Sequence, residues 1–347
     1  MTDRRLPRWS ELRPLLAPRR PELDPTTRRL ARAASIADLR AIARRRAPRG
    51  VFDYADGAAD TEIGLRRARE AFARVELIPS ILRDVSAIDT STTIFGRPAS
   101  MPLAFAPTGF TRLFPHEGER AGIPTGLSTV GTVTPEALVA EAPTTSKWFQ
   151  LYMWPDRDAS AELIARARAA GFHVLALTVD VPVAGSRLRD VHNGLVFPPR
   201  PTLRTLGDMA MHPSWWANVL TTEPLRFASL NAPPTTVARV ASLFDAALKD
   251  ADIGWLRELW DGPLVVKGVL TAEDARRVID LGADGVVVSS HGSRQLDLSP
   301  TPLEVLPEIV EAIGDRAEVF LDSGILTGAD IVAAVAMGAR ACLVARA

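Results

Sequence analysis

The chain has 347 residues and no net formal charge at pH 7, and 47% of its residues are hydrophobic. This length and composition are ample for a large core, in one barrel with insertions or in two small domains. The single cysteine excludes an internal disulfide, no apolar run reaches the roughly 18 residues of a membrane span, and the N-terminus lacks the apolar core of a signal peptide. We therefore expect a globular protein of the cytoplasm.

Residues 1–50 are strongly basic. They hold fourteen arginines against five acidic residues, and the rest of the chain balances this surplus. Ser35 followed by Asp38 predicts the start of a helix over 35–46, and Pro48 ends it. We expect a helical extension with a solvated, arginine-rich face, and contact with an anionic membrane surface is the alternative. No nucleic-acid motif accompanies the arginines, so we expect no nucleic-acid partner.

Beyond residue 100, eight short apolar runs each end abruptly in small or polar residues. They are 102–109, 125–129, 148–152, 174–180, 264–268, 285–290, 319–324 and 342–346. Between them, the segments 159–171, 271–282 and 327–338 have apolar residues three and four apart and a C-terminal glycine, as helices do. This alternation predicts parallel strands, and eight strands favour a (β/α)8 TIM barrel of the α/β class over an open doubly wound sheet. The polar strand ends then meet at one face.

Two parts of the expected barrel, residues 51–347, look incomplete. Between the first two runs, Pro115, Gly118 and other breakers leave room for scarcely two helical turns, whereas a parallel crossover needs about a dozen residues and usually a helix. The chain also ends at Ala347, directly after the eighth run. We therefore expect the last barrel helix to be missing and apolar surface on the eighth strand and its neighbours to be exposed.

The segment at about 185–262, between the fourth and fifth strands, is too long for an ordinary barrel loop. It is proline-rich at 198–201, and it then places Trp215 and Trp216 among apolar residues. Such mixtures are typical of interfacial segments. Membrane docking is one interpretation of this insert, and a substrate lid or ordinary packing is the other.

The stretch 285–297, GVVVSSHGSRQLD, places polar residues directly after a buried strand. His291 offers an imidazole, the side-chain group that most often serves as a general base, Gly292 permits a sharp turn, and Arg294 offers a planar fork that suits a carboxylate. We interpret them as a general base beside an anion clamp, and the alternative is a core-capping histidine with a surface arginine.

Lysine occurs at only three positions, 147, 249 and 267. Lys267 follows an apolar strand, where its compact charge would stabilise negative charge that develops on a ring or an enolate. A lysine side chain that extends to solvent is the alternative.

These residues belong to a longer pattern. The motifs LVVKG, VSSHGSRQLD and FLDSG, preceded by FDYADGAADTE, LAFAPTGF, FQLY and ALTVDVPVAGSRLRD, resemble the FMN-dependent α-hydroxy-acid dehydrogenases and oxidases. The resemblance covers residues 35–347 in order, and PTGFTRL and QLYMWPDRD are most similar to the bacterial L-lactate dehydrogenase branch. Three positions depart from the family pattern: Ser290 replaces asparagine, Leu326 replaces a basic residue, and Ala345 replaces glycine.

The resemblance implies that His291 takes a proton from a 2-hydroxy acid while two electrons pass to the flavin. Asp180 would lie against His291 and favour its charged form, and Tyr152 would contact the hydroxyl oxygen. Three further side chains would hold the substrate carboxylate: Tyr54, Arg187 and Arg294.

The resemblance also implies a set of FMN contacts and no metal site. Backbone at the first strand end would pass under the flavin, polar side chains at the next strand ends would bind its pyrimidine edge, Lys267 would stabilise the reduced ring, and the last two strand ends would hold the ribityl chain and phosphate. The residues, in chain order, are Pro107, Thr108, Gly109, Ser128, Gln150, Thr178, Lys267, Ser289, Asp322, Ser323, Gly324, Ala345 and Arg346.

The implied activity is the FMN-dependent oxidation of an L-2-hydroxy acid, with L-lactate to pyruvate as the first choice. Electrons would pass to a quinone or a cytochrome. We expect a homo-oligomer in the cytoplasm, or one held peripherally at the inner face of the cell membrane. The alternative is a non-catalytic or incomplete fragment of this family that does not hold FMN.

Overall fold

Eight parallel strands close into a barrel in the computed structural model, which describes residues 6–13, 22–109, 121–194, 202–222, 227–228 and 244–346. The strands are β3 (Leu103–Thr108), β4 (Thr125–Ser128), β5 (Lys147–Leu151), β6 (Val174–Thr178), β7 (Leu264–Val269), β8 (Gly285–Val288), β9 (Glu318–Leu321) and β10 (Ala341–Val344). They follow one another in chain order, and β10 pairs with β3 to close the ring. Each strand overlaps one of the eight expected runs, so the TIM barrel prediction is confirmed.

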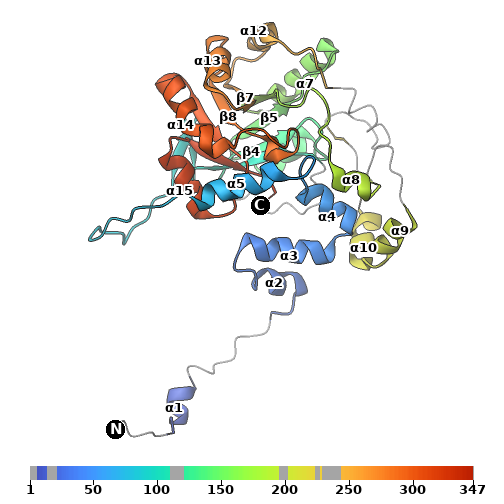
Figure 1. Ribbon diagram of the computed structural model, residues 1–347, viewed down its shortest axis with the longest axis vertical. Coiled ribbons are helices and arrows are strands. Elements are labelled where there is room, and N and C mark those ends of the chain that lie inside the picture. Colours follow the sequence, from blue (N-terminus) through green and yellow to red (C-terminus); the bar gives the residue numbers. More distant parts are fainter. Residues whose placement is uncertain are drawn as a thin grey trace.

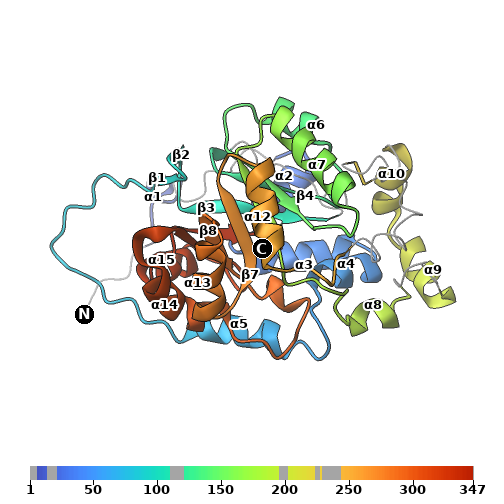
Figure 2. The same ribbon diagram turned by 90° about the horizontal axis from the view of Figure 1, so that it is seen from above.

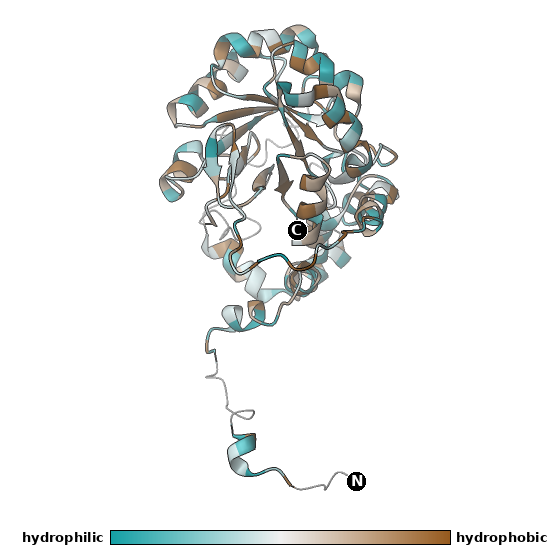
Figure 3. Ribbon diagram, turned by 90° about the vertical axis from the view of Figure 1, so that its left-hand side faces the viewer, coloured by the Kyte–Doolittle hydropathy of each residue, from teal (hydrophilic) through white to brown (hydrophobic). Residues whose placement is uncertain are grey.

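The strands are apolar on both faces because the barrel is packed inside and covered outside. Trp148 pairs with Val174, and both belong to the inner cluster, where the Trp148 ring meets Phe320 edge to face at 5.1 Å. Their neighbours Phe149 and Leu175 also pair, and they belong to the outer cluster beneath the helices. Figure 3 shows this as a hydrophobic sheet surrounded by helices of mixed hydropathy.

Helices cover the outside of the barrel (Figure 2). They are α6 (Pro135–Glu141), α7 (Arg157–Ala169), α12 (Asp250–Leu259), α13 (Ala272–Asp280), α14 (Pro302–Ile313) and α15 (Gly328–Ala336). Helices α7, α13 and α15 confirm the three expected from apolar spacing, and a short polar side chain caps the start of each one. The expected short first crossover lies in residues 110–120, which are outside the described part of the chain.

The expectation of exposed apolar surface is wrong for the eighth strand, although its neighbour β3 is only half-buried over most of its length. In β10, Ala341, Cys342 and Leu343 are all buried, because β3 and β9 pair with this strand on both sides and its side chains enter the inner and outer clusters. Exposed apolar side chains instead gather in the loop after α5, at Leu77, Ile78, Ile81, Leu82, Val85 and Ile88. This loop runs away from the barrel in Figure 2.

The N-terminal part is helical where it is described. It contains α1 (Trp9–Leu12), α2 (Pro25–Leu30), α3 (Ile36–Arg46), α4 (Arg49–Asp56) and α5 (Ile63–Ala73). Ser35 caps α3 by accepting a hydrogen bond from the Asp38 N–H, and the helix ends before Pro48, as predicted. A hairpin of β1 (Thr92–Ile94) and β2 (Arg97–Ala99) follows, and the ring of Phe95 packs against Trp148 and Phe320.

The insert after β6 contributes α8 (Leu188–His192), α9 (Leu203–Ala210) and α10 (Pro213–Thr221). These helices lie on the side of α4, away from α13 and α14 (Figure 1), and α8 and α9 contact α4 directly. The predicted insert, 185–262, is too long, because α12 is an ordinary barrel helix whose Ile253 and Leu256 are buried in the outer cluster. In the described part of the chain, no helix is long and apolar enough to cross a membrane.

Candidate active site

Polar side chains from five neighbouring strands meet where the strands end. Gln150, Thr178, Lys267, Ser289 and Asp322 are all buried, although the residues before them are almost wholly apolar. Lys267 Nζ lies 2.8 Å from Asp322 Oδ2 and donates a hydrogen bond of 2.7 Å to Ser289 Oγ. Burial would lower the pKa of Lys267, but the charges of Asp322 and Asp180 outweigh it and raise that pKa. A charged lysine therefore stands at the carboxyl end of the barrel.

His291 and Asp180 form a pair beside this lysine. His291 Nδ1 lies 2.9 Å from Asp180 Oδ1, the contact that the resemblance implied. Burial acts to raise the pKa of Asp180, but the charge and hydrogen bond of His291, with the charge of Lys267, lower it. Because Nδ1 is engaged by an ionised carboxylate, Nε2 is the ring nitrogen that can act on a substrate.

The backbone around His291 is held in an unusual conformation. His291, Gly292 and Ser293 have φ of 55°, 62° and 57°, in the left-handed region that costs free energy for residues other than glycine. Ser289 Oγ accepts a hydrogen bond from the His291 N–H at 3.0 Å, and Ser323 Oγ accepts one from the Gly292 N–H at 2.9 Å. Ser289 after β8 and Ser323 after β9 therefore hold the backbone that sets the direction of the His291 side chain.

Tyr54 lies between two arginines. The guanidinium carbons of Arg187 and Arg294 are each 5.1 Å from the centre of its ring. Arg294 donates to the carbonyl oxygens of Tyr54 and Gly57 at 2.8 and 2.7 Å. Burial, with the nearby charge of Arg187, lowers the pKa of Arg294. Two cations and a phenol in one place suit a carboxylate ligand.

Tyr152 stands at the end of β5, where its ring meets Phe244 edge to face at 4.8 Å. Burial and the negative charge of Asp180 raise the pKa of its hydroxyl group, so the hydroxyl keeps its proton at neutral pH. It can therefore donate a hydrogen bond to a substrate oxygen.

The remaining expected cofactor residues lie at other strand ends. Pro107, Thr108 and Gly109 end β3, half-buried, and Ser128 at the end of β4 donates to Gln150 Oε1 at 2.7 Å. Ser323 and Gly324 follow β9 with φ of 75° and 92°. Ala345 and Arg346 follow β10 and are exposed.

Arg346 is bound to backbone. Its guanidinium donates to the carbonyl oxygens of Ala55, Gly57 and Gly292 at 3.0, 2.8 and 2.8 Å. Arg346 and Arg294 thus share the Gly57 carbonyl oxygen, which brings together two of the three predicted anion-binding arginines. Among the described residues, no hydrogen bond joins Arg346 to Gly324.

Several buried polar side-chain atoms lack a hydrogen-bond partner among the described residues, and three of them lie at these strand ends: Gln150 Nε2, Thr178 Oγ1 and Asp180 Oδ2. A buried polar group without a partner costs about 1–3 kcal/mol, so a ligand that pairs with it gains that amount. Gln150 and Thr178 are the residues expected at the pyrimidine edge of a flavin, whose carbonyl and N–H groups match an amide and a hydroxyl. The side chains present therefore fit FMN.

Some residues that shape this site escaped the sequence prediction. Gly268 has φ of 108°, and a Cβ placed on it would lie only 2.6 Å from the Asp180 Cβ. Asp190 Oδ2 lies 2.9 Å from Arg187 Nε. Asp297 accepts hydrogen bonds from the N–H groups of Thr61 and Gly64 at 3.1 and 2.8 Å, and so fixes the start of α5. Asp190 ends the motif ALTVDVPVAGSRLRD and Asp297 ends VSSHGSRQLD, and this position is the only sequence signal that could have indicated their roles.

Residues 43–347 match the family described as FMN-dependent dehydrogenase. The chain is 51% identical to a putative L-lactate dehydrogenase of Mycobacterium tuberculosis, over 99% of this chain and 86% of that protein. It is 42% identical to L-lactate dehydrogenase of Caulobacter vibrioides, over 90% and 86%. Among solved structures, the monotopic membrane protein (S)-mandelate dehydrogenase superposes with a TM-score of 0.85 at 35% identity, covering 91% of this chain and 87% of that one.

Proposed function

Because the chain belongs to the family of FMN-dependent dehydrogenases, we propose that it oxidises a small L-2-hydroxy acid, L-lactate first, to the 2-oxo acid. Its cofactor is FMN, and it is a 2-hydroxy acid dehydrogenase. The observation that carries the proposal is the His291–Asp180 pair beside Tyr54, Arg187 and Arg294. A base next to a carboxylate-binding group is what a 2-hydroxy acid requires.

Bound FMN supplies the acceptor for two electrons. The carboxylate of the substrate binds to Arg187, Arg294 and the Tyr54 hydroxyl, and this contact turns the reacting carbon toward His291. Tyr152 donates a hydrogen bond to the hydroxyl oxygen. His291 Nε2 accepts a proton from the substrate, and the ionised Asp180 stabilises the positive ring that results.

The buried strand ends would hold the cofactor. Gln150 Nε2 and Thr178 Oγ1 would pair with the pyrimidine edge, because both are buried and have no hydrogen-bond partner among the described residues. Lys267 would oppose negative charge on the reduced ring, and its raised pKa keeps it charged. The remaining assigned residues would keep their expected roles, with backbone near Gly109 under the ring, Asp322 on the ribityl chain, and Gly324 with the 345–346 turn at the phosphate.

We also propose that electrons pass to a quinone or a cytochrome at a membrane surface. The insert exposes four large apolar side chains on α9, α10 and the turn between them: Leu203, Leu206, Met211 and Leu220. Trp215 and Trp216 stack edge to face at 5.0 Å on α10. Arg40 and Arg44 of the arginine-rich α3 line one pocket with Asp208 of α9. Their positive charge would suit an anionic leaflet. A solved relative described as monotopic supports this location.

Two measurements test the proposed activity. Purified protein should show the visible absorbance bands of a bound flavin, at about one FMN per chain. With a dye as electron acceptor, it should oxidise L-lactate faster than D-lactate, and pyruvate should form in step with dye reduction. Glycolate and L-mandelate serve as comparison substrates. A yellow protein that oxidises none of these acids would overturn the assignment.

A further inference from the structure

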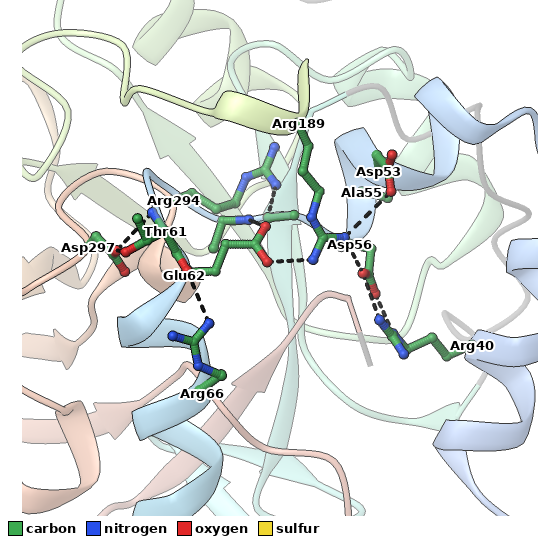
Figure 4. Close-up of polar contacts among 12 residues, drawn as sticks. Arg40, Asp53, Ala55, Asp56, Thr61, Glu62, Arg66, Arg189, Arg294 and Asp297 are labelled. Atoms are coloured by element: carbon green, nitrogen blue, oxygen red, sulfur yellow. Dashed lines mark hydrogen bonds and ion pairs between the residues drawn. The ribbon is translucent and has the colours of Figure 1, made fainter. Parts of the chain in front are cut away.

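One arginine of the insert binds three carboxylates at once. Arg189 on α8 lies 2.9 Å from Asp56 and 3.5 Å from Asp53 through Nη1, and its Nη2 is hydrogen-bonded to Glu62. Figure 4 shows its side chain reaching between the three acids, while Arg40 of α3 approaches Asp56 from the other side. The three acids are largely buried, with 12–16% of each side chain exposed. Without Arg189, water could therefore solvate their negative charges only in part.

The two segments that Arg189 connects also carry two of the expected substrate ligands, Tyr54 and Arg187. Tyr54 stands on α4 between Asp53 and Asp56, and Arg187 directly precedes α8. Asn193, just after α8, adds a second link by donating to Asp53 Oδ2 at 2.8 Å. Arg189 therefore joins the helix of Tyr54 to the helix that follows Arg187.

The segment held by Arg189 would not keep its shape by local preference alone. Asp60 and Glu62 have φ of 44° and 60°, a region that disfavours residues with a Cβ. The Asp60 N–H donates to the Ser186 carbonyl at 2.7 Å, next to Arg187. Gly57 packs directly on the linking residue, since a Cβ placed there would lie 3.4 Å from Arg189 Cδ.

We infer that Arg189 is a positioning residue, which sets Tyr54 of α4 against Arg187 so that both reach one carboxylate of the substrate. This inference rests on the proposed function and deepens it. A planar guanidinium can meet carboxylates on two of its edges, whereas the single ammonium of lysine cannot reach Glu62 and the α4 acids together. Loss of the Arg189 guanidinium should leave the fold and the bound flavin unchanged and weaken the binding of the substrate carboxylate.

The test compares Arg189→Gln and Arg189→Lys with Arg40→Gln in the FMN-loaded protein. Arg40 is the matched control, because it binds the same Asp56 but links it only to α3. We expect Arg189→Gln to raise the KM for L-lactate about tenfold and to change kcat less than about threefold, with an intermediate KM for Arg189→Lys. The Kd of oxalate, measured by calorimetry, should rise in parallel, while Arg40→Gln leaves both within about twofold. Equal effects of Arg40→Gln and Arg189→Gln would overturn the inference, as would a change in kcat alone.

A double-mutant cycle with Tyr54→Phe tests the route of the effect. If Arg189 acts by placing Tyr54, its loss should weaken oxalate binding much less in the Tyr54→Phe background than in the unmodified protein. Additive losses would contradict the inference. Should Arg189→Gln fail to fold, the Arg189→Lys variant carries the same cycle. If the variants change the Kd of oxalate as expected but the unmodified protein oxidises no 2-hydroxy acid, the proposed function fails and the positioning role of Arg189 stands.

Discussion

At the residue scale, the proposed chemistry depends on His291, whose Nδ1 is engaged by Asp180. Replacing His291 by alanine removes the proton acceptor and leaves the buried strand ends intact, so turnover of L-lactate should fall on the order of 10²–10⁴-fold while FMN stays bound. Steady-state rates and flavin absorbance measure the two effects. His192→Ala, an exposed histidine on α8, is the control and should keep full activity. Turnover within a few-fold of the unmodified protein would exclude His291 as the base.

Gly109 bears on the choice of electron acceptor. The resemblance places alanine at this position in several oxidases, whereas glycine is typical of the dehydrogenases. A Cβ placed on Gly109 would lie 3.2 Å from Val130 Cγ2, so this end of β3 has little spare room. We expect the reduced protein to react slowly with oxygen and rapidly with a quinone analogue in stopped-flow experiments. Faster reoxidation by air would contradict the proposed acceptor.

Residue roles could be predicted only where a motif carried them. His291, Lys267 and Arg294 stand in short, distinctive stretches directly after apolar strands, and their residue types suit the chemistry. Arg189 also stands in one of the family-like motifs, but its role was not predicted, because its carboxylate partners lie more than 120 residues earlier in the chain and no local spacing relates them. Contacts between distant segments depend on how helices pack, which periodicity does not report.

At the scale of elements, we predict that α9 and α10 bind membranes. Leu203 and Leu220 are 88% and 76% exposed, so charges there should cost little stability but oppose insertion into lipid. The protein should sediment with vesicles that contain phosphatidylglycerol, and the double variant Leu203→Glu, Leu220→Glu should stay in the supernatant with unchanged lactate oxidation by a dye. Leu82→Glu, in the exposed loop after α5, is the matched control. Equal sedimentation of all three proteins would contradict the prediction.

The elements of the barrel were readable because buried parallel strands and amphipathic helices have different periods. The insert was not readable to the same degree. The insert begins after β6 as expected, but its end was predicted too late, so that it included α12. The apolar spacing of a helix is the same whether the helix covers a barrel or belongs to an insertion. The burial of β10 was also mispredicted, because pairing with β3 and β9 covers it in a way that the sequence near Cys342 does not show.

For the whole molecule, FMN should act as a stabilising ligand. A ligand that binds only the folded state adds about 2.7 kcal/mol at a concentration one hundred times its Kd. In a chain of this size we expect the melting temperature to rise by roughly 5 °C when FMN is added to stripped protein. Differential scanning calorimetry measures the shift, and riboflavin, which lacks the phosphate, is the control ligand and should shift it less. A broad transition that FMN leaves unchanged would show that this chain does not hold its cofactor.

The burial of Cys342 makes the protein a ready scaffold for site-specific labelling. It is the only cysteine of the chain, it is fully buried in β10, and burial raises the pKa of its thiol to about 12. The thiol therefore stays protonated and shielded at neutral pH, whereas maleimides react with the thiolate. The native protein should resist maleimide and react at one site per chain only in denaturant. A cysteine introduced by Leu203→Cys would then carry a fluorophore alone, and its emission would report how deeply α9 enters a lipid surface.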